Sequence, residues 1–168
     1  MVCFKITAMK NIELIRKFYA SFSSGDANGM ISCYHTEVVF EDPAFGKLKG
    51  NRARNMWLML LSRSQSKLTI EYSDIKVEGS EGFAKWKAQY YYGPKKRKVI
   101  NNVQATFQFM DGNILHHTDH FSLWKWTMQA LGISGFALGW SSFMKNKIQK
   151  STNKMLAEFM IKKGEINY

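Results

Sequence analysis

The sequence predicts an α+β protein in which helices at both ends flank a β-sheet. In the segments 11–35 and 52–64 apolar residues recur at helical spacing, and after residue 66 they alternate with polar residues at the period of strands. Helical spacing returns from residue 141 onward. The chain has 168 residues, of which 45% are hydrophobic, so a single substantial core is expected.

Three helices are expected in the N-terminal part. The first covers residues 11–23, whose apolar side chains share one face. Asp26 is the expected N-cap of a second helix over 27–35, since a short acceptor side chain satisfies the free N–H groups of a first turn. Asn51 takes the same role for a third helix over 52–64.

A strand that ends at Asp42 separates the second helix from the third. Alternation places Val38, Phe40 and Asp42 on one side of this strand. Pro43 keeps Asp42 extended, because proline disfavours a helical conformation in the residue before it. A carboxylate therefore lies in line with two side chains of a buried face.

Further strands are expected after residue 66. They cover residues 68–77, 84–92 and 99–109, followed by a closing strand that ends at Phe121. In the closing strand His117 and Asp119 fall on the apolar side, so an imidazole and a second carboxylate interrupt another buried face.

The length of the last hairpin loop decides which side chains face each other. A three-residue loop over 110–112 puts His117 and Asp119 on the same side as the apolar face of 99–109. A two-residue loop would place them opposite Asn102 and Gln104. The three-residue loop is preferred because it buries more apolar surface.

The C-terminal part has a different composition. Glycines between residues 124 and 140 indicate turns and short helices, and 141–163 is expected to be a lysine-rich amphipathic helix. Three interpretations of this helix stay open, namely packing on its own sheet, contact with a partner subunit, and peripheral contact with an anionic membrane. Packing on the protein itself is favoured.

Composition narrows the class of protein. The net charge is +11, but the basic residues are scattered apart from 95–98 and the C-terminal third, so a nucleic-acid partner is not favoured. The two cysteines, Cys3 and Cys33, predict neither disulfide nor metal site and are typical of a cytoplasmic protein. No secretory leader or membrane-spanning run is expected.

These features together resemble one family of folds. Over about residues 8–124 the chain is similar to the nuclear transport factor two-like superfamily, which includes ketosteroid isomerases, SnoaL-like polyketide cyclases and limonene epoxide hydrolases. The resemblance rests on Gly25-Asp26, Tyr34, the run Val38-Val39-Phe40-Glu41-Asp42-Pro43 and the closing strand from Gly112 to Phe121.

The resemblance implies a fold and a class of ligand. It implies a cone of strongly bent antiparallel sheet packed against three helices over residues 1–124, with 125–168 as a helical extension packed on the same domain. It also implies a pocket for a small apolar molecule, no cofactor, and a homodimer. The extension is similar to one seen in a bacterial subgroup of the superfamily.

The resemblance carries over two acids, one from each of two related enzymes. Asp42 falls where ketosteroid isomerases keep their general base, but the positions of their two oxyanion donors fall on Phe18 and near Ala105. Asp119 falls where limonene epoxide hydrolases carry one aspartate of an Asp-Arg-Asp triad. The other two positions of that triad fall on Trp86 and Ala88.

The expected catalytic residues are Asp42, Asp119 and His117. Burial would raise the pKa of Asp42 and suit it to proton transfer, whereas its structural alternative is to cap the turn after Pro43. For His117 and Asp119 the alternative is a satisfied buried pair with Asn101. The expected lining of the pocket is Phe18, Tyr19, Tyr34, Trp57, Trp86, Tyr90, Asn101 and Phe121.

Three hypotheses of function follow. The first is an enzyme without cofactor or metal that isomerises, cyclises or hydrates a small apolar substrate by proton transfer. Asp42 would be its base, Asp119 and His117 its acid or water-positioning groups, and Asn101 an orienting donor. The second is a ligand-binding or protein-association module of the same fold. A third reading makes the basic tail the functional part, docked on an anionic surface.

Overall fold

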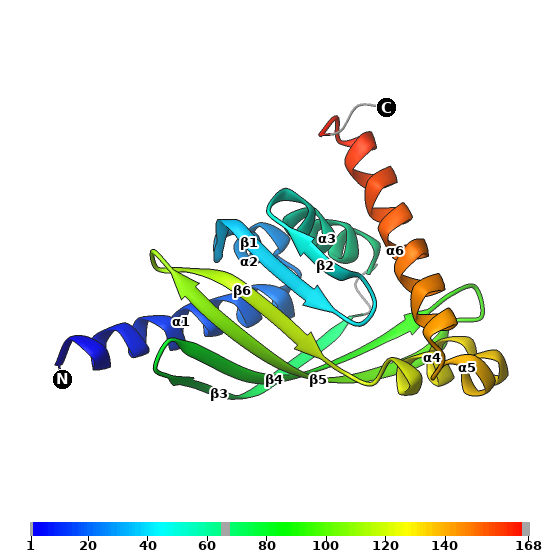
Figure 1. The fold of residues 1–168 in the computed structure, drawn as a ribbon, viewed down its shortest axis with the longest axis horizontal. Helices are drawn as coiled ribbons and strands as arrows, with labels where there is room; N and C mark the ends of the chain where they lie inside the picture. Colours follow the sequence, from blue (N-terminus) through cyan, green and yellow to red (C-terminus); the bar gives the residue numbers. More distant parts are fainter. Residues whose placement is uncertain (1, 65–67, 166–168) are drawn as a thin grey trace.

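The structure is a computed structural model that describes residues 2–64 and 68–165, with side chains from residue 6 onward. It confirms the α+β fold, with helices on both sides of the strands in sequence (Figure 1). In chain order the elements are α1 (Val2–Ser24), α2 (Ala27–Ser32), β1 (Tyr34–Asp42), β2 (Gly46–Lys49), α3 (Asn51–Arg63), β3 (Thr69–Glu78), β4 (Glu81–Tyr92), β5 (Arg97–Met110), β6 (Asn113–His120), α4 (Leu123–Leu131), α5 (Ile133–Leu138) and α6 (Ser142–Lys162).

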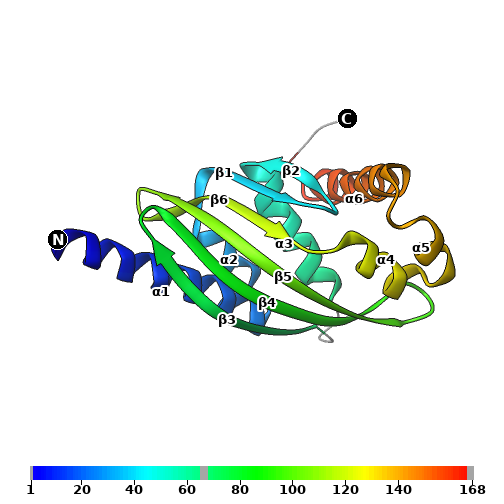
Figure 2. The same ribbon diagram turned by 60° about the horizontal axis from the view of Figure 1, so that its bottom comes forward.

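The strands form one open sheet in the order β2-β1-β6-β5-β4-β3. Helices α1, α2 and α3 lie behind one face of this sheet (Figure 2). All neighbouring strands run antiparallel except β1 and β6, which are parallel, so the sheet is mixed, whereas the resemblance implies an antiparallel one. The short edge strand β2 was also not predicted.

Helix α2 begins as predicted and ends early. The side chain of Asp26 accepts a hydrogen bond from the N–H of Gly29 at 2.8 Å, which confirms it as the N-cap. The helix ends at Ser32, and Tyr34 is already the first residue of β1. Pairing with β6 takes the chain out of the helix, since Tyr34 faces Ile114 across the two strands.

The N-cap of α3 differs from the prediction. Gly50, with φ of 49°, occupies the cap position, and Asn51 is the first helical residue. The amide of Asn51 instead donates to Glu165 at 2.7 Å. A contact with the far end of the chain thus replaces the local cap.

In the β5–β6 hairpin, His117 and Asp119 lie on the predicted face, but the turn is shorter than predicted. Its turn has two residues, Asp111 and Gly112, with φ of 51° and 76°, where the sequence predicts three. A bulge at Leu115 then adds one residue on β6 that no residue of β5 faces. His117 and Asp119 consequently lie on the buried face, where they are 0% and 2% exposed.

The C-terminal part consists of short helices followed by one long helix, as predicted. Helix α6 contacts α3, and its residues Met144, Ile148, Leu156 and Met160 are buried. Its polar side chains bind the turn after β1, where Gln149 donates to the carbonyl of Pro43 at 3.1 Å. The helix therefore covers the end of the strand that carries Asp42.

Some expectations fall outside the described part of the chain. These are the side chain of Cys3 and residues 65–67, where the helical period gives way to strands. Cys33 is a buried free thiol. None of the helices described is both long enough and apolar enough to cross a bilayer.

Candidate functional site

The parallel pairing of β1 and β6 brings the two predicted acids together. Phe40 pairs with His117 and Glu41 with Thr118, and the next residue on each strand is an aspartate. Asp42 and Asp119 are therefore neighbours on adjacent strands, on the face that also carries Phe40 and His117. This pairing is the central geometric feature of the site.

One carboxylate oxygen of Asp42 accepts hydrogen bonds, and the other accepts none from the described residues. Its Oδ1 accepts hydrogen bonds from the N–H groups of Ala44, at 2.9 Å, and Phe45, so the turn-capping role is present. Its Oδ2 has no hydrogen-bond partner within the described part of the chain. Burial is the main cause that raises the pKa of Asp42 to about 7, the Phe45 N–H opposes the rise, and the nearby charge of Asp119 contributes to it.

Asp119 belongs to a buried chain of hydrogen bonds. Trp57 Nε1 donates to the hydroxyl of Tyr34 at 2.8 Å, and that hydroxyl is 2.8 Å from His117 Nδ1. His117 Nε2 in turn lies 3.1 Å from Oδ1 of Asp119, which also accepts from Trp86 Nε1 at 3.1 Å. We call these five residues the relay.

The direction of one hydrogen bond in the relay is fixed by chemistry. An indole N–H can only donate, so the Tyr34 oxygen accepts from Trp57. A neutral His117 whose Nε2–H donates to the Asp119 carboxylate has Nδ1 as the acceptor for the Tyr34 hydroxyl. Two N–H groups thus hold Oδ1 of Asp119, while no described residue donates to its Oδ2.

The deep part of the predicted lining is packed core. Phe18, Tyr19, Tyr34 and Trp57 are at most 3% exposed, and the ring of Phe18 lies 5.3 Å from that of His117. These residues contact one another and form the floor beneath the acids. Burial raises the pKa of Tyr19 well above its usual value, and its hydroxyl is buried without a hydrogen-bond partner among the described residues.

The other predicted lining residues remain partly exposed. These are Trp86, Tyr90, Asn101 and Phe121. Asn101 does not join His117 and Asp119, contrary to the structural alternative, because it pairs with Ala88 while Ala105 pairs with Asp119. Tyr34 and Trp86 take the place that the sequence assigned to Asn101.

Trp126 of α4 was missed by the sequence analysis. Its indole donates to the hydroxyl of Tyr90 at 2.7 Å, and burial raises the pKa of Tyr90. No local pattern could have revealed this contact, since the two residues lie 36 positions apart. Within residues 2–64 and 68–165, no three histidine, cysteine, aspartate or glutamate side chains are placed to hold a metal ion.

An open cavity of about 660 Å³ lies beside the strands β3, β4 and β5 and the start of α4. Most of its polar lining comes from side chains that alternate away from the core, such as Lys85, Lys87 and Gln104. Trp86, Asn101 and Phe121 also border it, but the two aspartates and His117 do not.

Comparison with known proteins identifies a family and a fold. Residues 15–117 match the model of the SnoaL-like domain. No curated protein matches the sequence. The matched segment includes Asp42 and ends two residues before Asp119.

Several solved structures share the fold. A proposed polyketide cyclase from Xanthomonas campestris is 19% identical with a TM-score of 0.59, covering 73% of this chain and 98% of that one. An LEH-like epoxide hydrolase from M. tuberculosis is 20% identical with a TM-score of 0.58, covering 77% and 96%. The epoxide hydrolase/cyclase-like enzyme SalBIII, which acts in pyran ring formation in salinomycin, is 16% identical with a TM-score of 0.57, covering 65% and 88%.

Proposed function

Because this chain belongs to the SnoaL-like domain family, we propose that it binds a small, largely apolar molecule and transforms it by acid–base proton transfer. The reaction class is isomerisation, cyclisation or water addition without a cofactor. The observation that carries this proposal is that Asp42 and Asp119 directly follow the paired residues Glu41 and Thr118 on adjacent strands, with a pKa of about 7 for Asp42.

Asp42 is the proton-transfer group in this proposal. A pKa of about 7 means that the carboxylate and the carboxylic acid are both populated near neutral pH. The same side chain can therefore take a proton from the substrate and return it at another atom or to the leaving oxygen. Its free Oδ2 is the atom assigned to this role.

Asp119 and His117 hold the second reacting position. Trp86 and His117 fix one oxygen of Asp119, so its other oxygen has a defined direction for a substrate hydroxyl or an attacking water. His117 acts through Asp119 and is a positioning residue. Phe18, Tyr19, Tyr34 and Trp57 form the apolar floor, while Trp86, Tyr90, Asn101 and Phe121 form the wall that a ligand can reach.

The alternative is a non-catalytic binding or association module. The packed aromatic floor favours it, because a relay whose hydrogen bonds are satisfied inside the protein also has a purely structural value. In that case the two aspartates have a structural role, and a ligand binds and dissociates without reacting.

Proton exchange separates the two functions without knowledge of the substrate. A panel of small apolar ketones, enones and lactones is incubated in D₂O, and loss of their carbon-bound α protons is followed by NMR. We expect a pH–rate profile with an inflection near 7 for at least one compound, and Asp42→Asn should lower the rate by roughly 10²-fold or more.

Glu41→Gln is the matched control, because Glu41 is the neighbouring carboxylate on the exposed side of the same strand. It should retain the exchange. Exchange that survives in Asp42→Asn at the wild-type rate would overturn the assignment of the base. Compounds that bind equally to both proteins, with exchange in neither, would favour the binding module.

Three further expectations stand as proposals. The family resemblance favours a homodimer, which light scattering coupled to gel filtration would detect as twice the mass of 19.4 kDa. Fractionation of cells would test the cytoplasmic location. Contact between the lysine-rich helix α6 and an anionic membrane would give vesicle binding that falls as salt rises.

A further inference from the structure

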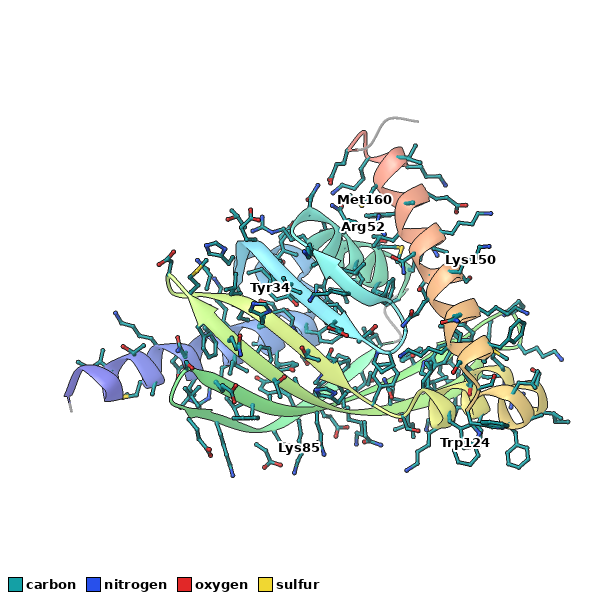
Figure 3. All side chains as sticks on the ribbon, viewed as in Figure 1. Tyr34, Arg52, Lys85, Trp124, Lys150 and Met160 are labelled. Carbon is teal, nitrogen blue, oxygen red and sulfur yellow. The ribbon has the colours of Figure 1, made fainter. Side chains whose placement is uncertain are left out.

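One end of the molecule exposes an unusual number of large apolar side chains. Helices α4 and α5 and the start of α6 lie together there, far from the N-terminus of α1 (Figure 1). Figure 3 shows Trp124 at the lower edge of this end. We call the following residues the apolar tip, with their exposed fractions: Ile133 89%, Trp140 75%, Phe143 68%, Phe136 62%, Leu138 47% and Trp124 40%.

The α4–α5 pair is built with its small residues inside. A Cβ on Gly135 would lie 2.0 Å from the carbonyl oxygen of Thr127, and one on Gly139 would lie 1.9 Å from the Thr127 hydroxyl. That hydroxyl donates to the carbonyl of Trp124 at 2.8 Å. The two helices therefore meet through glycine and threonine, which forces the large apolar residues outward.

In most proteins the large apolar side chains face inward, so their outward position here indicates that another surface covers the tip. Aromatic side chains each present about 150–250 Å² of surface, so six large residues at these exposures show on the order of several hundred Å². The largest contiguous apolar patch on a typical monomer is about 300–600 Å² and is often functional, and the tip reaches this size. Smaller groups of exposed apolar residues, such as Ile6 and Met9 on α1, need no such explanation.

The chain segment that forms the tip is basic. From residue 120 to 157 the sequence contains no aspartate or glutamate, and it contains five lysines. The basic turn between β4 and β5 is held against the same end of the molecule, since Arg97 Nε donates to the carbonyl of Gln129 in α4 at 2.8 Å. Lys150 lies further along α6, above the part of the molecule that carries Trp124 (Figure 3).

We propose that the apolar tip binds the surface of an anionic phospholipid bilayer. Tryptophan and phenylalanine with flanking lysines have the composition of interfacial anchors, in which the rings enter the headgroup region and the ammonium groups contact the lipid charges. No described helix can span the bilayer, so the contact is peripheral. A second copy docked on the same patch would bring two lysine-rich rims together, which like-charge repulsion disfavours.

One of the open interpretations of the helix 141–163 is membrane contact through that helix. The structure instead buries the apolar residues of α6 beyond its first turns against the body of the protein, as for Leu156 and Met160. The contacting surface therefore comprises α4, α5 and only the N-terminal end of α6.

Vesicle sedimentation tests the proposal with the full chain. Vesicles of phosphatidylcholine alone are compared with vesicles that also contain 30% phosphatidylglycerol, at low and high NaCl. We expect binding to the anionic vesicles only, reduced by salt, with a blue shift of tryptophan emission. Trp140→Ser combined with Phe143→Ser should weaken this binding by roughly tenfold or more, and should leave the melting temperature unchanged because both side chains are exposed.

The control removes the same number of apolar side chains from the opposite end of the molecule. Ile6→Ser combined with Met9→Ser, at residues 51% and 67% exposed, should bind the anionic vesicles as the wild type does. Equal binding by the Trp140/Phe143 variant and the wild type would overturn the proposal. So would a lipid-free dimer that this variant abolishes, because the patch would then belong to a second copy.

Discussion

Replacing Asp42 by asparagine tests the electrostatics of the site directly. Asparagine keeps a side-chain oxygen that can accept the N–H groups of Ala44 and Phe45, so the turn after β1 is preserved. What disappears is a carboxyl that folding places in a poorly solvated position beside Asp119. We therefore expect the substitution to change the pH dependence of stability and not the fold.

The magnitude follows from the pKa of Asp42, which rises from 3.8 to about 7 on folding. Between these two values the folded chain holds a proton that the unfolded chain has lost, so stability falls as the pH rises through this range. At 1.36 kcal/mol per pKa unit, the loss is complete above pH 7 and amounts to about 4 kcal/mol. Asparagine does not ionise, so Asp42→Asn should be more stable than the wild type by up to about 4 kcal/mol at pH 8.

Urea unfolding followed by tryptophan fluorescence measures this difference. The free energy of unfolding is compared for the two proteins at pH 5 and pH 8, and the advantage of Asp42→Asn should grow by roughly 2–3 kcal/mol between them. Glu41→Gln is the control, since it removes a carboxylate from the exposed side of the same strand. Its effect should be the same at both pH values to within a few tenths of a kcal/mol.

The result that refutes the reasoning is a constant difference. If Asp42→Asn changes stability equally at pH 5 and pH 8, then Asp42 ionises in the folded protein as it does in water. The pairing with Asp119 would then carry no electrostatic consequence, and Asp42 would serve the turn alone.

Three further variants, two substitutions and one deletion, test the relay, the contact between α4 and α5, and the bulge. Tyr34→Phe removes the partner of the buried Trp57 indole and should lower the free energy of unfolding by roughly 2–3 kcal/mol, whereas a change below 0.5 kcal/mol would mean that the relay is not formed. Gly135→Ala should destabilise by about 1–3 kcal/mol in the same measurement, because its Cβ would meet the backbone of Thr127; an unchanged midpoint would show that α4 and α5 separate freely. Deletion of Leu115 removes only the residue that has no partner on β5 and keeps the pairs of Phe109 with Ile114 and of Gln108 with His116, so the cooperative transition should be retained; its complete loss would argue against the bulge.

The positions of single side chains on their faces were readable from the sequence. Alternation alone placed Asp42 in line with Phe40, and it placed Asp119 in line with His117. Both assignments hold because the period of a strand is two, whatever it pairs with. The cap at Asp26 was equally local, since its acceptor and the N–H of Gly29 lie within one turn of helix.

For the β5–β6 hairpin, the sequence predicted the face of His117 correctly but the length of the turn incorrectly. The choice of a three-residue loop put His117 on the buried side, and the actual turn of two residues would have reversed it without the bulge at Leu115. Burial of apolar surface favours His117 on the inner face, and the bulge at Leu115 is the backbone feature that places it there. A bulge leaves no clear signature in the sequence.

The sequence by itself determined that Asp42, His117 and Asp119 lie on apolar faces, that Asp26 caps α2, and that the C-terminal part is basic and contains several glycines. Only the tertiary structure decided that β1 lies parallel to β6 and so joins Asp42 to Asp119. It also decided that Tyr34 connects Trp57 to His117, and that α4 and α5 turn their large residues outward. The physical reason is that periodicity fixes the face of a residue, whereas its neighbours depend on which distant segments bury the most surface together.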